Sequence, residues 1–196
     1  MVTVDMKGLL LRLNPYCTNQ LQAAAGLCVS RTHYEISVEH FLVKILEEPR
    51  SDVPLILQKF GIEVGKMMKS LEEVLEDYKA GNPGKPVFSP LLLDLVQEAW
   101  LVASIDLEER LIRSGAVLLA LLTRPMFFAS GRYGDTLKTV NRETLLKDFW
   151  AMTKSSVEAR TESVGAAGPV GKPEAGKGGR RQFSRPVLHR FHPESP

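Results

Sequence analysis

Apolar residues recur at helical spacing along most of the chain. Met6, Leu9, Leu10 and Leu13 follow the i, i+3, i+4, i+7 pattern of one helix face. A longer stripe of the same kind runs over residues 64–78. Runs that alternate between apolar and polar residues, as half-buried strands do, are nearly absent. The pattern therefore predicts an all-α fold.

Turn and capping signals separate the expected helices. Asn14-Pro15 and Ser89-Pro90 each supply an N-cap side chain followed by a proline, which fits the first turn of a helix. Residues 80–87 contain two glycines and two prolines, and this composition predicts a linker. We expect helices over residues 3–13, 15–30, 37–48, 51–60, 64–78, 90–104 and 114–122, and a last one that starts at Asn141.

Two of these segments are apolar nearly all round. Segment 90–104 has a single polar stripe, formed by Asp94, Gln97 and Glu98, and segment 114–122 has no charged residue. A helix that is apolar on every side belongs in the interior of a protein. We therefore expect both helices to be largely buried.

The two halves of the helical region resemble each other. Anchor residues of segment 21–49 recur in the same order in segment 95–125, and both series close on a proline. The first series is Leu21, Ala25, Leu27, Ser30, Ile36, Leu42, Ile45 and Pro49, and the second is Leu95, Ala99, Leu101, Ser104, Ile112, Leu118, Leu121 and Pro125. The ordered match favours a duplication, with repeats at about 15–79 and 89–125. A chance alignment of two Leu- and Ala-rich helical hairpins is the alternative.

Composition and charge narrow the classes of function. Of 196 residues, 44% are hydrophobic and 24% are charged, so the chain can bury a substantial core. Its 25 Lys and Arg residues nearly balance its 23 Asp and Glu residues, which argues against a nucleic-acid or membrane-surface binder. The longest apolar run, 115–122, is too short to span a membrane, and no secretory signal is visible. We expect a cytoplasmic protein with no nucleic-acid or membrane partner.

The C-terminal part of the chain has a different composition. Residues 161–196 are rich in glycine and proline and contain few apolar anchors, which is typical of an unstructured segment. We assign a helical domain to residues 1–153 and a flexible Gly/Pro-rich tail to residues 154–196. Segment 171–177 has the spacing of a phosphate-binding loop, but Gly178 follows where such a loop needs Ser or Thr. We interpret this match as chance.

Candidate catalytic and metal-binding residues are few. Cys17 and Cys28 lie on one expected helix, too far apart for a disulfide, and we expect both in the core. His33 and His40 lack partners at metal-ligand spacing, and the position of His40 in a first helical turn favours capping or packing. No Ser/His/Asp constellation is suggested. We expect no catalytic residue, no metal site, no cofactor and no enzymatic activity.

Several short motifs, taken in order, resemble a known family. The stretch Glu35-Ile-Ser-Val-Glu-His40 and the leucines after it resemble the start of the third helix in N-terminal domains of Clp/Hsp100 AAA+ unfoldases. Leu13-Asn14-Pro15, which ends the extra first helix, is similar to the ClpV branch of type VI secretion, as is Phe88-Ser89-Pro90. The resemblance implies a duplicated four-helix repeat with an extra N-terminal helix and a C-terminal helix.

The resemblance also implies a function. In the ClpV branch, the extra helix forms one wall of a hydrophobic groove that binds an N-terminal helix of the large sheath subunit. This contact recruits the hexameric ATPase to contracted sheaths for disassembly and recycling, while the isolated domain is expected to be monomeric. The groove residues carried over by the resemblance, with the orientation of the last two left open, are Leu9, Leu10, Leu13, Phe88, Leu91 and Leu92.

Two other functions are alternatives. Within the same family, the domain could serve a Clp protease partner or a disaggregase and bind adaptors or unfolded proteins. The helix expected over residues 3–13 argues against this, because those relatives begin close to the second helix. A small helical enzyme is the alternative from a different class, and the lack of a polar constellation counts against it.

Overall fold

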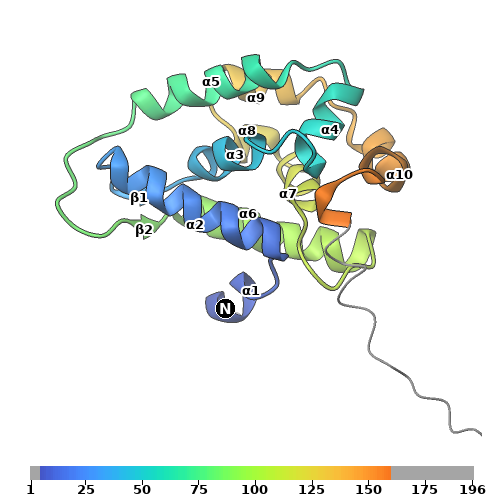
Figure 1. Ribbon diagram of the computed structural model, residues 1–196, viewed down its shortest axis with the longest axis horizontal. Coiled ribbons are helices and arrows are strands. Elements are labelled where there is room, and N and C mark those ends of the chain that lie inside the picture. The colour runs from blue at the N-terminus through green and yellow to red at the C-terminus, as the bar shows by residue number, and fades with distance from the viewer. Residues whose placement is uncertain (1–4, 160–196) are drawn as a thin grey trace, which may run out of the picture.

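Helices account for most of the computed structural model, which describes residues 5–159 (Figure 1). This confirms the expected all-α class, to which the structure adds one short parallel ladder of two strands. The elements are α1 (Met6–Leu10), α2 (Pro15–Ser30), β1 (Glu35–Ile36), α3 (Val38–Leu46), α4 (Asp52–Lys59), α5 (Val64–Glu76), β2 (Val87–Phe88), α6 (Pro90–Leu101), a π-helical turn η1 (Val102–Asp106), α7 (Ser114–Leu121), α8 (Pro125–Phe128), α9 (Gly131–Leu137) and α10 (Arg142–Thr153).

The main helices start where the sequence predicts, because their caps are local. The Asn14 side chain accepts a hydrogen bond from the Cys17 amide at 2.8 Å, and Ser89 accepts one from the Leu92 amide at 3.1 Å. A proline occupies the first turn after each cap. At the start of α3, Ser37 and His40 form a capping box, so the capping role expected for that histidine is confirmed.

The backbone pairings support the duplication. Helices α2 to α5 and α6 to α9 follow each other in the same order, and the residue before each leading helix enters a parallel pairing. Phe88, before α6, pairs with Ile36, which precedes α3. Leu13, before α2, pairs with Ile112, which precedes α7. Each repeat therefore pairs with the other in an equivalent way, as expected for two copies related by an approximate two-fold axis.

The two apolar helices differ in burial. Every residue of α7 is buried, as expected, and this helix contacts α4, α6 and α10. The expectation for residues 90–104 is wrong, because α6 buries one face against α7 and leaves its outer side at the surface. Leu101 is 45% exposed and Ile105 in η1 is 69% exposed. An apolar sequence could not distinguish a core helix from one that borders α1 and solvent.

Three further boundaries are corrected by the structure. Helix α1 ends at Leu10, because the next residues turn and Leu13 is drawn into its pairing with Ile112. The second repeat does not stop at Pro125 but continues through α8 and α9, two short helices that the apolar pattern did not predict. The ordered domain also continues past residue 153, since Ser156 and Glu158 are fully buried.

The remaining expectations concern the two cysteines, the two ends of the chain and membrane-spanning helices. Cys17 and Cys28 are unpaired and buried, as expected. The expected start of the first helix at residue 3, the flexible tail over 160–196 and the chance phosphate-loop match at 171–177 lie outside the described residues. Within residues 5–159, no helix has both the length and the apolar character needed to cross a membrane.

Candidate functional site

An apolar groove of about 470 Å³ lies between α1 and α2. Its walls are mostly aliphatic, and its polar residues are one lysine, one threonine and one glutamine. Figure 1 shows α1 beside the start of α2, apart from the bulk of the helices. The groove is lined by Lys7, Leu10, Leu11, Leu13, Thr18, Leu21, Gln22, Ala25 and Phe88.

One wall of the groove is a single face of α2. Thr18, Leu21, Gln22 and Ala25 have the i, i+3, i+4, i+7 spacing that puts side chains on one side of a helix. Leu21 is buried at the base of this wall, and Ala25 is half-buried. A face of this kind presents a long, shallow apolar surface, which is the shape that the apolar side of a second helix fits.

The other wall is α1, a helix of five residues that cannot be stable alone in water. Leu9 holds it to the body, because this side chain is only 5% exposed and α1 contacts α6. The Arg12 guanidinium lies 4.9 Å from the centre of the Trp100 ring on α6, a cation–π contact. The backbone of Arg12 and Asn14 is hydrogen-bonded to Ile112 at 2.6 and 3.0 Å.

The structure divides the six residues predicted for the groove into three sets. Leu10, Leu13 and Phe88 line it. Leu9 and Leu92 do not line it and lie in the core, at 5% and 1% exposure. Leu91 borders a different pocket. The sequence could not resolve this, because the stripe of α1 is wide enough to serve both α6 and the groove.

Sequence reasoning also missed residues that line the groove. Leu11 is 81% exposed and stands at its rim, while Leu21 and Ala25 form part of the α2 wall. The helical spacing of Thr18, Leu21 and Ala25 was present in the sequence. It did not identify the wall, because the inner face of a core helix has the same spacing.

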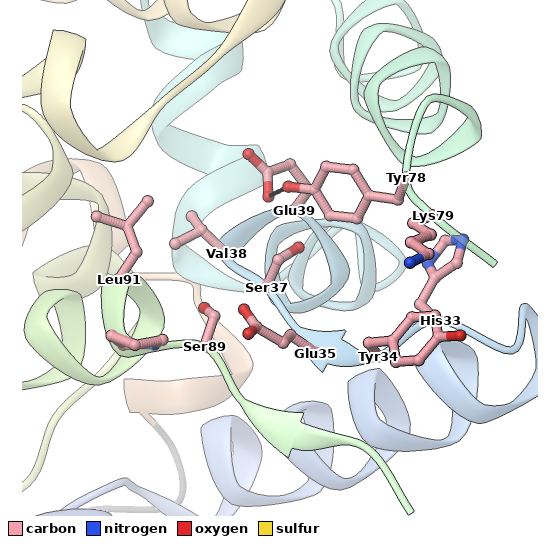
Figure 2. Close-up of a pocket in the computed structure, with 11 residues that line it drawn as sticks. His33, Tyr34, Glu35, Ser37, Val38, Glu39, Tyr78, Lys79, Ser89 and Leu91 are labelled. Carbon is pink, nitrogen blue, oxygen red and sulfur yellow. Dashed lines mark hydrogen bonds between the residues drawn. The ribbon is translucent and has the colours of Figure 1, made fainter. Parts of the chain in front are cut away.

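A second pocket, of about 500 Å³, is bordered mainly by residues with polar side chains and is called the polar pocket (Figure 2). It lies where the first turns of α3 and α6 meet, and Figure 2 shows Tyr34, Lys79 and His33 on one side of it and Leu91 on the other. The polar pocket is lined by His33, Tyr34, Glu35, Ser37, Val38, Glu39, Tyr78, Lys79, Ser89, Pro90 and Leu91.

The carboxylate of Glu39 at the edge of the polar pocket is held by hydroxyl groups. Tyr78 donates a hydrogen bond to Oε2 at 2.6 Å, and Tyr133 and Ser130 donate to Oε1 at 2.6 and 3.2 Å. Burial, followed by the charge of Glu39, raises the pKa of both tyrosines far above the usual range. The phenols are therefore donors at neutral pH, and this carboxylate has a structural role.

The two histidines near the polar pocket are also occupied by local contacts. The Ser37 amide donates to His40 Nδ1 at 3.1 Å, so the proton of the neutral ring is on Nε2, which donates to His33 Nδ1 at 2.9 Å. Burial, then the charge of His33, lowers the pKa of His40 to about 4. Among residues 5–159, no group of three or more His, Cys, Asp or Glu side chains could hold a metal ion.

The groove and the polar pocket therefore differ in what they can do. The polar residues of the pocket hold helix starts and tyrosines in place, and the contact of Ser37 Oγ with His40 Nδ1 at 2.9 Å belongs to the capping box of α3. The groove offers apolar area with a few polar groups at its edge. It is suited to binding the apolar face of a helix, and it is the candidate functional site.

Comparison with known proteins identifies related domains. The family model of the Clp repeat (R) N-terminal domain matches residues 12–130. The structure is similar to the N-domain of ClpV from Vibrio cholerae, with a TM-score of 0.76 and 36% sequence identity over 81% of this chain and 95% of that chain. A complex of a ClpV N-domain with a VipB peptide gives a TM-score of 0.73 and 38% identity over 81% of this chain and 97% of that chain. These matches confirm the expected fold.

Two curated relatives are much longer than this chain. AAA+ ATPase ClpV1 of Pseudomonas aeruginosa is 25% identical over 114 residues, which are 58% of this chain and 13% of the relative. Chaperone protein ClpB of Yersinia enterocolitica is 24% identical over 158 residues, which are 80% of this chain and 18% of the relative. The aligned segments thus cover less than a fifth of the length of either relative.

Proposed function

The chain belongs to the family of Clp repeat N-terminal domains, and we propose that its groove binds an N-terminal helix of the large sheath subunit of a type VI secretion system. In this proposal, binding brings a ClpV-type AAA+ unfoldase to contracted sheaths in the bacterial cytoplasm, for disassembly and recycling. The matched region is an N-terminal domain and not the ATPase module.

The observation that carries the proposal is the apolar groove between α1 and α2. Its lining combines an aliphatic helix face with Leu10, Leu13 and Phe88, which is the surface that an amphipathic helix needs. The similarity to a ClpV N-domain solved with a VipB peptide supports a peptide ligand. The presence of α1 favours the ClpV branch over the rest of the family, since α1 supplies one of the two walls.

The size of the groove limits the affinity of one domain. A helix enters such a surface with two or three large apolar side chains, each of which contributes about 1.5–3 kcal/mol on burial. The entropy cost of association offsets much of this sum, so we expect a dissociation constant on the order of micromolar. Such an affinity suffices when the domains of a hexamer act together on a polymeric sheath.

The test is binding of a labelled sheath N-terminal peptide, followed by fluorescence anisotropy. Leu10→Asp puts a carboxylate on the groove wall, and Phe88→Ala removes an aromatic anchor. Each should weaken binding by about tenfold or more, as at interface hot spots. Ile105→Asp is the matched control, because Ile105 is an exposed apolar residue outside the groove, and this variant should bind normally.

The folded state must be checked for each variant by circular dichroism. Leu9→Asp is unsuitable as a groove variant, because it places a charge at a buried position and should release α1 from α6. Unchanged peptide affinity in folded Leu10→Asp and Phe88→Ala proteins would contradict the assignment of the groove.

The similarity to ClpB supports a second candidate function, namely binding of adaptors or unfolded chains. Competition separates the two. If the groove serves sheath helices, an unfolded model protein in excess should not displace the labelled sheath peptide. Displacement of the labelled sheath peptide by the unfolded protein would favour the ClpB-like function.

A further inference from the structure

The carboxylate of Glu158, near the C-terminal end of the described domain, is fully buried at the start of three helices. Its Oε2 accepts hydrogen bonds from Asn14 Nδ2 at 2.9 Å and from the Ser114 amide at 2.8 Å. Its Oε1 accepts one from the Asp52 amide at 3.0 Å and one from the Ser114 hydroxyl. These donors lie at the N-termini of α2, α4 and α7, where the helix dipoles favour a negative charge.

A buried ion pair lies beside this carboxylate. Arg113 Nε and Nη2 donate to the two Asp52 carboxylate oxygens at 2.8 and 2.9 Å. Burial, then the charge of Asp52, raises the pKa of Glu158, while hydrogen bonds from Ser114 and the Asp52 amide act in the opposite direction. The Glu158 cluster consists of Asn14, Asp52, Arg113, Ser114 and Glu158. It joins segments that are far apart in the sequence.

The Glu158 cluster is connected to the groove through one backbone pairing. Leu13, which lines the groove, pairs with Ile112. Asn14 follows Leu13 directly, and Ser114 lies two residues after Ile112, so the carboxylate binds both chains of the pairing. The segment from Leu11 to Leu13 leads directly back to α1. The position of the α1 wall therefore depends on the Leu13–Ile112 pairing, and Glu158 binds residues that follow this pairing on both chains.

We propose that Glu158 is a positioning residue for the groove: by binding Asn14 and Ser114 at once, it fixes the Leu13–Ile112 pairing and with it the α1 wall. Glu158 is fully buried and does not line the groove, so the proposed effect acts through the pairing. The effect on peptide binding rests on the proposed function. The effect on the pairing does not, and it can be measured on the free protein.

The other repeat supplies an internal control. Phe88 also lines the groove, and its pairing with Ile36 is the counterpart of the Leu13–Ile112 pairing. The Ser89 amide donates to Ile36 O at 3.0 Å, just as the Asn14 amide donates to Ile112 O at 3.0 Å. The Ser89 pairing has no hydrogen bond to Glu158. A substitution at Glu158 should thus affect one pairing and spare the other.

The first experiment measures amide hydrogen exchange in the Glu158→Gln variant. Glutamine keeps the size of the side chain but removes the charge and one acceptor, which weakens the contacts to Asn14 and Ser114. The Asn14 and Ile112 amides should exchange faster by about tenfold or more, as expected when a hydrogen bond to a buried charge is lost. The Ser89 amide should be much less affected. Equal acceleration at Asn14 and Ser89 reports a general loss of stability and would overturn the proposal.

The second experiment measures sheath-peptide affinity in the same variant. Binding should weaken by about fivefold or more if the α1 wall loses its position. Thr153→Val is a matched control, because it removes the buried hydrogen bond from the Thr153 hydroxyl to Phe149 O. The Phe149 ring lies 5.6 Å from the Arg113 guanidinium of the cluster, and Thr153 is not part of the pairing. At a similar loss of melting temperature, the control should keep its affinity.

The two experiments separate the two proposals. Normal peptide affinity in a folded Glu158→Gln protein overturns the coupling between the cluster and the groove. If the unsubstituted domain does not bind the peptide, the proposed function fails. In that case the difference in exchange between Asn14 and Ser89 still decides whether Glu158 fixes the wall.

Discussion

The two junctions between the repeats have the same backbone arrangement, but one contains an open pocket and the other is filled by a side chain. At the first junction, α3 and α6 begin side by side beside the β1–β2 ladder, and their first turns open into the polar pocket. At the second, α7 and α2 begin beside the Leu13–Ile112 pairing, and the carboxylate of Glu158 fills the space between them. The segment after α10 thus closes one of two equivalent sites and leaves the other open.

A single position explains much of this difference. Glu39 is the second residue of α3. It corresponds to Gly115, the second residue of α7, when Ile36 is aligned with Ile112. A Cβ atom on Gly115 would lie 2.6 Å from a ring carbon of Phe149 and 3.0 Å from a carboxylate oxygen of Asp52. The glycine therefore makes room for α10 and for the ion pair. In the first repeat the same position carries a glutamate, which tyrosines satisfy instead.

The largest expected effect comes from removing the cation of the second junction. Arg113→Met leaves the buried carboxylates of Asp52 and Glu158 close together without the guanidinium that pairs with Asp52. Breaking a buried pair in this way should lower the free energy of unfolding by about 3–5 kcal/mol. The measurement is urea denaturation at neutral pH, followed by circular dichroism.

The control for this prediction is Arg142→Met. Arg142 forms a partly exposed ion pair with Asp106 at 3.1 Å, and pairs of this kind contribute about 0–1 kcal/mol. Equal losses of unfolding free energy in the two methionine variants would contradict the prediction, because the buried ion pair would then contribute no more than the partly exposed one.

A smaller loss of stability is expected when a side chain is added at the packed second junction. Gly115→Ala forces the added methyl group against Phe149 and Asp52, and crowding of a packed core costs about 1–3 kcal/mol. Gly26→Ala, at an exposed position of α2, meets no atom within 4 Å and should be neutral or stabilising because alanine is the better helix former. Thermal unfolding of both variants measures the difference. A Gly115→Ala protein as stable as Gly26→Ala would show that α10 can move away from α7.

The sequence predicted those parts of this architecture that depend on neighbouring residues. Asn14, Ser37, Ser89 and Asn141 each cap a helix by accepting a hydrogen bond from the residue three positions later, so each start could be predicted from a short segment of sequence. The duplication was visible for the same reason, because both repeats keep the same order of anchors. The family resemblance predicted a groove beside the first helix, and Leu10, Leu13 and Phe88 of the six residues predicted for it line the apolar groove of the structure.

The features that the sequence did not predict depend on contacts between distant segments. Glu158 looked like part of a polar tail, and only its contacts with Asp52 and Ser114, distant in the sequence, place it in the core. Leu9 and Leu10 are neighbours on one apolar stripe, yet one faces the core and the other the groove. Short α9 has glycines at both Gly131 and Gly134, and no local pattern marked it as a helix.

The smallest expected effect is a pH dependence that differs in sign between the junctions. At the first junction, His40 binds protons less readily in the folded state, where its pKa is about 4, than in the unfolded chain, where it is about 6.5. Its contribution to stability is therefore present above pH 6.5 and is lost as the pH falls from 6.5 towards 4. At the second junction, the raised pKa of Glu158 acts in the opposite direction: its contribution is lost as the pH rises above the ordinary carboxyl range.

Two substitutions separate these contributions. In Glu158→Gln the opposing group is gone, so the free energy of unfolding should fall more steeply between pH 7 and pH 5 than it does in the unsubstituted domain. Adding His40→Gln should flatten that fall, because the side chain that gains a proton on unfolding is then absent. His33 and Tyr78 lie against the His40 ring from other segments, and the charges of the adjacent Glu39 and of Arg31 also act on its pKa; all four residues remain in both proteins. Urea denaturation at several pH values gives the slopes. Equal slopes with and without His40 would mean that its ring is protonated as easily in the folded domain as in water, and that the capping contact with the Ser37 amide does not hold it neutral.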